Sequence, residues 1–180
     1  SLISAIAPDI QTSGQFSGSL NLGMKDGHLH IHAEKVLELT NGNLETTHEG
    51  KRIENLDLRF KPAITFEMPI IKAKFTELHV THEQEILAAG DISASWDTNT
   101  QEPRNIQSRL EINLGGLSKQ PILRKPSNVQ EGTVNIHAQM IDKDPYDIQA
   151  KLTFADLKLK NSGDRLNSLT TDFDGNWDSE

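Results

Sequence analysis

The sequence predicts an all-β protein in which a twisted antiparallel sheet curls into a β-taco or a partly open jelly roll. Three observations support this prediction. Polar and apolar residues alternate over most of the chain, as in strands with one wet face and one dry face. Gly, Asn, Asp and Pro separate these stretches at short intervals, which is typical of turns in a β-meander. No long segment has helical periodicity.

The clearest strand pattern occurs twice. Residues 27–33 (Gly-His-Leu-His-Ile-His-Ala) match residues 132–138 (Gly-Thr-Val-Asn-Ile-His-Ala), and each opens on a Gly followed by strict alternation. A second match follows each copy, because residues 50–56 and 163–169 share Gly, Arg and Leu in register. Two matches in the same order predict an internal duplication. The offsets, 105 and 113 residues, differ by eight, which we interpret as a loop insertion.

The first half of the chain is predicted to contain an end segment and one β unit. Residues 1–12 place apolar side chains near helical spacing, which predicts a short end helix that covers an open sheet edge. Residues 13–114 form the first β unit, with a hairpin turn signal at 25–27. Pro62 and Pro69 each remove a ladder donor, so they predict an edge strand or a bend.

Later elements follow the same pattern with interruptions. Leu78 and Val80 continue a strand with shifted parity, which predicts a bulge. Residues 82–89 fit either a turn of helix or a hairpin. Residues 115–130 are predicted to be an irregular connection, since they hold two prolines and no alternation. Residues 131–180 are predicted to form a second β unit, which we expect to be incomplete and to continue in a longer parent protein.

Composition excludes several functions. The net charge is −8, with 26 acidic and 18 basic residues, and no Lys/Arg cluster of the kind that binds nucleic acid or an anionic membrane surface is present. The absence of Cys excludes a disulfide framework and thiolate chemistry. No apolar run of about 18 residues occurs, so the sequence predicts no membrane span. The chain begins on Ser1 without a signal peptide, which we interpret as an excised segment.

A possible metal site is the histidine series in the first repeated strand. His28, His30 and His32 project from one face at intervals of about 6.6–6.8 Å. Ligands of one zinc ion lie within roughly 3.5 Å of each other, so this spacing is wide for three ligands. We therefore expect a solvated polar face, with a metal site as a remote alternative.

No arrangement for catalysis stands out. Glu83 and Glu85 form a carboxylate pair, but such pairs are inevitable among 26 acidic residues. No catalytic Ser-His-Asp arrangement or phosphate-binding loop is present, so we expect neither enzymatic activity nor a cofactor. Trp96 and Trp177 are predicted to be large core residues rather than ligand platforms.

The apolar faces of the predicted strands supply the functional hypothesis. A sheet must bury its apolar face, and without an amphipathic helix it must fold on itself. A closed β-sandwich would serve as a spacer or as a protein-interaction module through its edge strands. An open trough would instead accept acyl chains, which gain about 0.8 kcal/mol per CH₂ on leaving water. The residues expected to line the trough are Leu29, Ile31, Ile64, Phe66, Phe75, Ile92, Trp96, Leu110, Ile112, Leu114, Val134, Ile136, Ile148, Leu152 and Phe154.

The alternating pattern and three motifs, at residues 154–159 (Phe-Ala-Asp-Leu-Lys-Leu), 163–169 and 174–177 (Asp-Gly-Asn-Trp), resemble the AsmA-like family of diderm bacteria, with its TamB-like and YhdP-like members. The resemblance implies a long hydrophobic β-sheet groove in the periplasm, as part of a protein anchored in the inner membrane. It implies transport of phospholipid or another acyl-bearing molecule and support of outer-membrane biogenesis in the cell envelope. Envelope proteins are a further expected class of partner, through the edge strands of the sheet. The family offers no catalytic residues.

Overall fold

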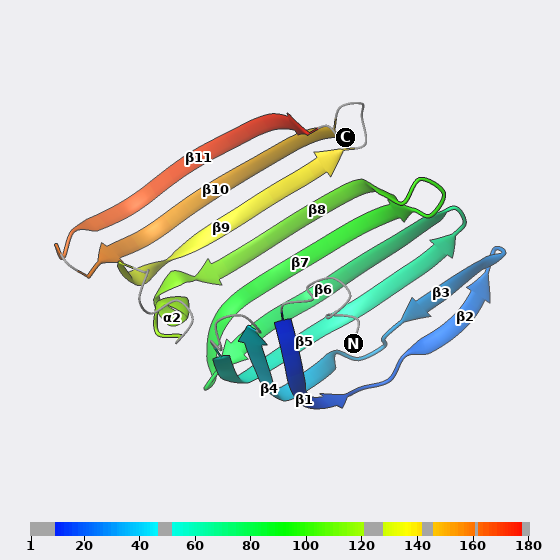
Figure 1. The fold of residues 1–180 in the computed structure, drawn as a ribbon, viewed down its shortest axis with the longest axis horizontal. Helices are drawn as coiled ribbons and strands as arrows, with labels where there is room; N and C mark the ends of the chain where they lie inside the picture. Colours follow the sequence, from blue (N-terminus) through cyan, green and yellow to red (C-terminus); the bar gives the residue numbers. More distant parts are fainter. Residues whose placement is uncertain (1–9, 47–51, 121–127, 142–145, 161, 178–180) are drawn as a thin grey trace.

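The described residues fold into one antiparallel sheet with one short helix, α2, on it (Figure 1). This arrangement comes from a computed structural model, which describes residues 10–46, 52–120, 128–141, 146–160 and 162–177. The all-β prediction is confirmed. The end helix predicted for residues 1–12 falls mostly outside the described residues, and the last part of that segment begins the first strand at Ile10.

The sheet has 11 strands and the helix lies between the eighth and the ninth. The elements are β1 (Ile10–Ser17), β2 (Asn21–Lys25), β3 (His28–His32), β4 (Leu37–Thr46), β5 (Arg52–Glu67), β6 (Ile70–His82), β7 (Glu85–Asp97), β8 (Glu102–Asn113), α2 (Leu114–Ser118), β9 (Val129–Ile141), β10 (Tyr146–Leu159) and β11 (Arg165–Trp177).

The topology is a meander, and we call each strand position across the sheet a lane. Each of the first two lanes is filled by two short strands instead of one long strand. From β5 to β11 every strand pairs with the next one in sequence. On the other side of β5, β4 pairs with its first part up to Phe60, and β3 pairs with its last part from Ala63. Likewise β1 pairs with β4 and β2 with β3. The pairs β1/β2 and β3/β4 therefore each occupy the place of one long strand.

Pro62 lies at the joint between β3 and β4. The backbone N–H of Ala33 donates to the Pro62 carbonyl over 3.1 Å, and on its other side Pro62 faces Phe75 of β6. A proline is tolerated in the middle of β5 because no continuous strand on that side needs its missing N–H. The prediction of an edge or a bend at Pro62 thus corresponds to a break in the neighbouring lane.

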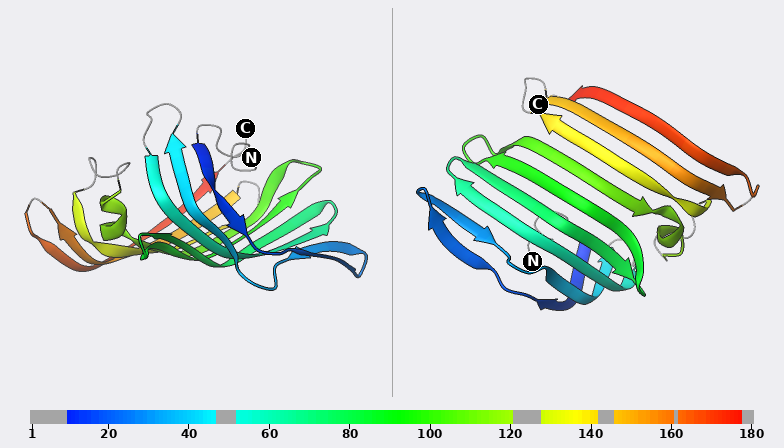
Figure 2. Two further views of the ribbon diagram at one scale, coloured as in Figure 1. Left: turned by 90° about the horizontal axis from the view of Figure 1, so that it is seen from below. Right: turned by 180° about the vertical axis from the view of Figure 1, so that it is seen from behind.

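The sheet is curled and open. β1, β4 and the first part of β5 rise on the side of the sheet that carries α2 (Figure 2). Phe16 and Phe60 belong to strands separated by β4, yet their ring centroids are 6.4 Å apart, and Phe60 lies 6.0 Å from Phe75. Strands two apart in a flat sheet are separated by roughly 9.6 Å, so the sheet bends toward these rings.

The two outer lanes, β1/β2 and β11, are not paired with each other, so the barrel or sandwich is not closed. The curled-sheet prediction is confirmed. The alternative of a closed β-sandwich is wrong for the described part of the chain, because consecutive hairpins place all of its strands in one sheet.

Local irregularities lie where the alternation shifts. The predicted bulge is confirmed, because the β6–β7 register shifts between Phe75 and Leu78, with Glu77 at φ 53°. Of the two alternatives for residues 82–89, the hairpin is the one present. Glu83 and Gln84 both have positive φ and form its turn.

The two copies of the sequence repeat differ in topology. The first pair of matching segments lies in β3 and at the start of β5, which are neighbours in the sheet. The second pair lies in β9 and around the start of β11, which are separated by β10. In the sequence one strand lies between the members of each pair, β4 in the first and β10 in the second. β4 shares a lane with β3, whereas β10 occupies a lane of its own, so what recurs is the strand pattern and not the arrangement.

The connection predicted at residues 115–130 begins with α2. Its N-cap is Asn113, whose Oδ1 accepts from the Gly116 N–H over 2.8 Å, and the Ser118 hydroxyl donates to the Gly115 carbonyl over 2.9 Å. This helix is too short to show periodicity in the sequence. Because β8 pairs with β9 across the connection, the sheet is continuous from one predicted β unit to the other.

A candidate apolar trough

One face of the sheet carries rows of apolar side chains that cross every lane of the meander. Residues directly opposite each other in antiparallel strands share a face, so the pairing registers define each row. One row has a member in each of nine lanes and spans roughly 38 Å at the usual strand spacing. Its members are Phe16, Leu39, Leu58, Val80, Ala88, Ile112, Val134, Phe154 and Leu169.

A second row runs parallel to the first toward the other end of the strands. Its members are Leu22, Ile31, Ile64, Ala73, Ala94, Ile106, Met140, Ile148 and Gly175. Between the two rows lie shorter runs on the same face. One of them contains Leu110, Ile136 and Leu152, and the other contains Phe75, Ile92, Ser108, Ala138, Ala150 and Phe173.

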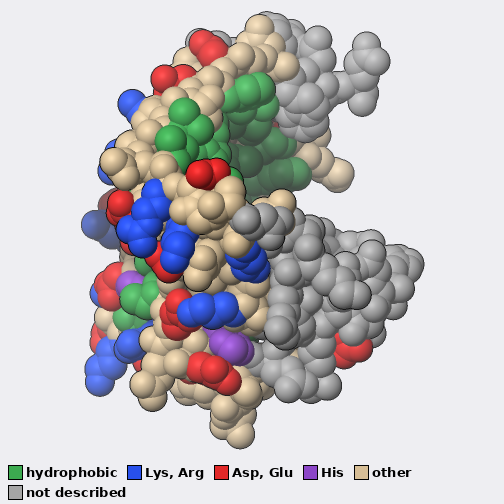
Figure 3. All heavy atoms as spheres, turned by 90° about the vertical axis from the view of Figure 1, so that its left-hand side faces the viewer, with side chains coloured by type: hydrophobic (Ala, Val, Ile, Leu, Met, Phe, Trp, Pro, Cys, Tyr) green, Lys and Arg blue, Asp and Glu red, His purple; other side chains and the backbone are tan. Residues whose placement is uncertain are grey.

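This face is the inner, concave one. The converging rings of Phe16, Phe60 and Phe75 belong to it, and α2 lies on the same side of the sheet (Figure 2). Figure 3 shows hydrophobic side chains gathered in a hollow of the molecule, while charged side chains are spread over the outer surface. We call this concave face the trough.

The trough is best covered at its middle and near α2. Val134 and Met140 are buried on β9, and Leu87 is buried next to α2. Exposure rises toward the rims, where 49% of Leu169 and 57% of Phe173 remain accessible on β11. The opposite rim is similar, since Phe16 and Leu22 are also exposed. Large apolar side chains left exposed together are unusual unless something covers them.

The structure places the predicted lining residues on this face, with one exception. Leu114 is the first residue of α2 rather than the end of a strand, because the Asn113 cap ends the alternation there. Trp96, expected in the core, is 45% exposed and faces Ile71 on the trough side. The remaining predicted residues lie on strands at positions of these rows or next to them: Leu29, Ile31, Ile64, Phe66, Phe75, Ile92, Leu110, Ile112, Val134, Ile136, Ile148, Leu152 and Phe154.

Several members of the trough were not among the predicted residues. Phe16, Leu39, Leu58 and Val80 supply the first row on the strongly curled side, and Phe173 supplies the rim. Their alternation was visible in the sequence. The sequence does not show which strands are neighbours in the sheet. Only the pairing of strands shows that the apolar faces of separate strands form one continuous surface.

Polar clusters lie at both ends of the central strands. At one end the buried Asp97 carboxylate accepts from Nη2 of Arg104 over 2.7 Å and from the Asn99 backbone N–H over 2.8 Å. The Arg104 hydrogen bond is the main cause that lowers the pKa of Asp97 below its usual value, and the backbone N–H of Asn99 adds to it. This cluster holds the β7–β8 turn beside Trp96.

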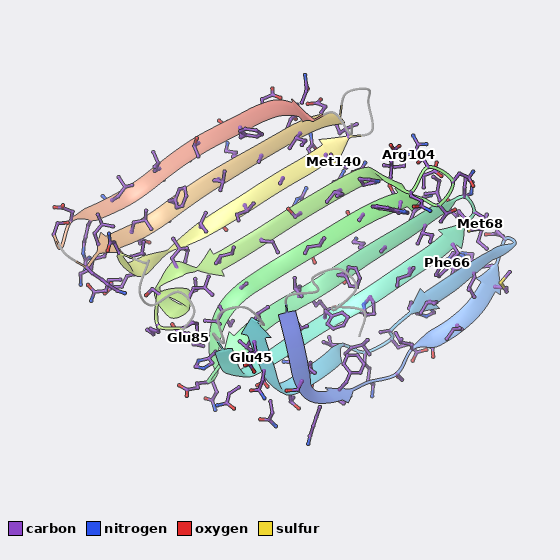
Figure 4. The ribbon with its side chains drawn as sticks, in the orientation of Figure 1. Glu45, Phe66, Met68, Glu85, Arg104 and Met140 are labelled. Carbon is purple, nitrogen blue, oxygen red and sulfur yellow. The ribbon has the colours of Figure 1, made fainter. Side chains whose placement is uncertain are left out.

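At the other end, Glu85 joins the strand to the helix region. Its carboxylate accepts from Nζ of Lys119 over 3.0 Å and from Nδ2 of Asn113 over 3.2 Å. Figure 4 shows Glu85 and Arg104 at opposite ends of the central strands. Both clusters have structural partners, so neither presents a free reactive group to the trough.

The histidine series of β3 lies on the face opposite to Leu29 and Ile31. His30 places Nδ1 3.1 Å from Oγ1 of Thr65 on β5. Near it, Glu67 accepts a hydrogen bond from Lys72, which lowers the pKa of Glu67, and the charges of His28 and His30 act in the same direction. Across the described residues, no three His, Cys, Asp or Glu side chains are grouped so that they could hold a metal ion.

The polar face carries a wide hollow of about 750 Å³. Two rows of polar side chains flank it. One row consists of Asp91, Arg109, His137, Lys151 and Asp172, and the other of Ser93, Gln107, Gln139, Gln149 and Asp174. Basic, acidic and uncharged polar groups are therefore mixed along the hollow. Such a mixture is typical of a solvated face and favours no single class of ligand.

Comparison of the chain with protein-family models, curated proteins and solved structures gives no match. The structure itself therefore defines the class: an open, curled antiparallel sheet with an apolar concave face. No helix in the described part of the chain is long and apolar enough to cross a membrane.

Proposed function

We propose that the chain forms a segment of an apolar conduit that carries phospholipid or another acyl-bearing molecule. The observation that supports this proposal is the unbroken apolar row from Phe16 to Leu169 on the concave face of an open sheet. The transfer of an acyl chain from water to this face is favourable by about 0.8 kcal/mol per CH₂ group. Because apolar contacts are non-directional, the chain can slide from one row to the next.

The polar ends of the strands suit the rest of such a ligand. A headgroup stays hydrated at the open side while the acyl chain contacts the trough. The resemblance to AsmA-like proteins supports a periplasmic setting, an anchor in the inner membrane of the parent protein, and a role in outer-membrane assembly. These features are part of the proposal.

A spacer or protein-interaction module is the competing function. The described residues do not form the closed sandwich on which this alternative was based. A protein segment, instead of a lipid, could nevertheless cover the trough. The two functions differ in what is bound to the purified chain.

Mass spectrometry of organic extracts from the purified chain tests the proposal. We expect phospholipid in stoichiometric amounts with the wild-type chain. Ile106→Asp adds a charge to the trough at a residue that is 38% exposed, so the fold tolerates it, while an acyl chain would desolvate the carboxylate. We expect lipid occupancy to fall by about tenfold.

Gln107→Glu is the matched control. Gln107 is the next residue of β8, is exposed, and faces the opposite side of the sheet. This variant adds the same charge without touching the trough, so its lipid content should equal that of the wild type. A lipid-free wild type, or equal loss of lipid in both folded variants, would favour the interaction module.

A further inference from the structure

Two hairpins of the sheet expose large apolar side chains at the end where the Asp97–Arg104 pair lies. The β5–β6 hairpin turns at Met68, and 71% of this residue is exposed. In the β7–β8 hairpin, Trp96 is the last residue but one of β7 and is 45% exposed. At the opposite end, the β6–β7 turn consists of residues 83–84 (Glu-Gln). Large apolar side chains that are exposed together commonly mark a binding surface.

Trp96 belongs to a third apolar row on the trough face, beyond the second row. The row crosses six strands, and its members are Met24, Leu29, Phe66, Ile71, Trp96 and Pro103. We call Phe66, Met68, Ile71 and Trp96 the apolar tip, and Figure 4 shows Phe66 and Met68 at this end of the strands. The apolar tip lies on β5, β6 and β7, inside the sheet, so further strands beside either outer lane would leave it in place.

Several polar groups at the apolar tip have partners within the chain. Pro69 has no N–H, and its carbonyl accepts from the backbone N–H and from the hydroxyl of Thr98, each over 2.9 Å. The Asp97 carboxylate accepts from two backbone N–H groups of the turn that follows it. Polar groups without partners are costly in apolar surroundings. Because these groups are paired, Met68 and Trp96 can leave water together at a low polar cost.

The charged residues next to Met68 and Trp96 in the sequence form ion pairs. Glu67, which precedes Met68, pairs with Lys72, and Asp97, which follows Trp96, pairs with Arg104. Each pair cancels its own charge, whereas the whole chain has a net charge of −8. An anionic surface would therefore repel the chain, and a surface without net charge would not.

We propose that the apolar tip docks on a phospholipid bilayer whose headgroups have no net charge. Tryptophan and other large apolar side chains are typical of protein segments that enter the interfacial region of a bilayer. The third row lies beside the second row of the trough, so an acyl chain that leaves the bilayer at the apolar tip contacts apolar side chains at once. The inference rests on the proposed function, because docking supplies the place where lipid enters the conduit.

Flotation of the full 180-residue chain with phosphatidylcholine vesicles tests the docking. We expect the wild-type chain in the vesicle fraction. Met68→Glu adds a charge at an exposed turn residue, and a carboxylate resists transfer out of water. The partition coefficient should fall by at least about tenfold. Met68→Leu keeps an apolar side chain of similar volume and should float like the wild type.

Gln84→Glu is the matched control. Gln84 is an exposed residue of the β6–β7 turn, at the opposite end of the strands, and the variant changes the net charge of the chain by the same amount as Met68→Glu. Its flotation should equal that of the wild type. Thermal unfolding should match the wild type in every variant, since both positions are exposed. Equal loss of flotation in the two charged variants would overturn the proposal.

Mass spectrometry of extracted lipid separates this inference from the proposed function. A chain that copurifies with phospholipid but does not float with the vesicles would overturn the docking and leave the conduit in place. A chain that floats through Met68 but holds no lipid would support the docking and contradict the conduit.

Two further outcomes would overturn the proposal. Flotation that occurs only with vesicles containing anionic phosphatidylglycerol would contradict the charge argument. Self-association that Met68→Glu abolishes, in a chain that does not float with vesicles, would mean that a second copy covers the apolar tip instead of a bilayer.

Discussion

Gly116 of α2 lies so close to Leu87 of β7 that a Cβ on the glycine would be 2.8 Å from Cδ2 of the leucine. Only 2% of Leu87 is exposed. The helix therefore acts as a small cover over one end of the trough, and a glycine permits the close approach of its backbone.

Leu87→Ala removes the side chain that supports α2. We expect the free energy of unfolding to fall by about 2–4 kcal/mol, since a buried leucine loses its transfer free energy and leaves a cavity. Urea titration followed by circular dichroism measures this change. Ile86→Ala is the neighbouring control, because Ile86 is 49% exposed and its loss should cost less than about 1 kcal/mol. Equal losses would mean that α2 does not pack on Leu87 in solution.

Gly90 is required by the backbone of β7. Its φ is 150°, and a Cβ at this position would lie 2.0 Å from the Arg109 carbonyl oxygen on β8. Gly90→Ala should therefore destabilise the sheet by at least about 2 kcal/mol, through strain and the displacement of β8. Gly23→Ala is the control, because nothing lies within 4 Å of its added Cβ. A Gly90→Ala melting curve that matches this control would contradict the close β7–β8 approach.

The Asp97–Arg104 pair predicts a loss of stability in acid. The hydrogen bond from Arg104 lowers the pKa of Asp97 in the folded chain below the value of about 3.9 expected after unfolding. The unfolded state then binds a proton first, so this contribution is present above about pH 4 and disappears as the pH falls through the folded pKa.

Urea midpoints measured between pH 3 and pH 7 test this pH dependence. Asp97→Asn should lower the midpoint at pH 7 and flatten its decrease below pH 4, because the variant no longer takes up this proton. Arg104→Gln should reduce the acid sensitivity in the same way. If both variants keep the acid slope of the wild type, other carboxylates cause it.

Trp96 offers a direct probe of the trough. It is 45% exposed on the trough face, where a bound acyl chain would contact it. In a Trp177→Phe background, which leaves Trp96 as the only tryptophan, brominated fatty acid should quench the fluorescence in a saturable way. A bromide salt at equal bromine concentration is the control. Equal quenching by both would show simple solvent exposure without acyl binding.

The sequence predicted the trough face because alternation is a local property. Side chains alternate between the two faces of a strand, so the apolar residues of each strand lie together on one face. Ile31, Ile64 and Ile112 are therefore expected on the apolar face of the sheet without knowledge of which strands are neighbours. The break between β3 and β4 opposite Pro62 depends on a contact between distant segments. The same is true of the half-exposed Trp96, since exposure reflects how far the sheet closes. Neither follows from the period of one strand.

The broken lane at β3/β4 makes the β2–β3 hairpin a separate unit of local unfolding. Four residue pairs, from Leu29 opposite Phe66 to His32 opposite Ala63, hold this hairpin to the rest of the sheet. Its amides should exchange with solvent earlier than those of β5 to β10, a difference that hydrogen exchange with mass spectrometry can measure. Opening of this hairpin would widen one rim of the trough while the main meander stays folded.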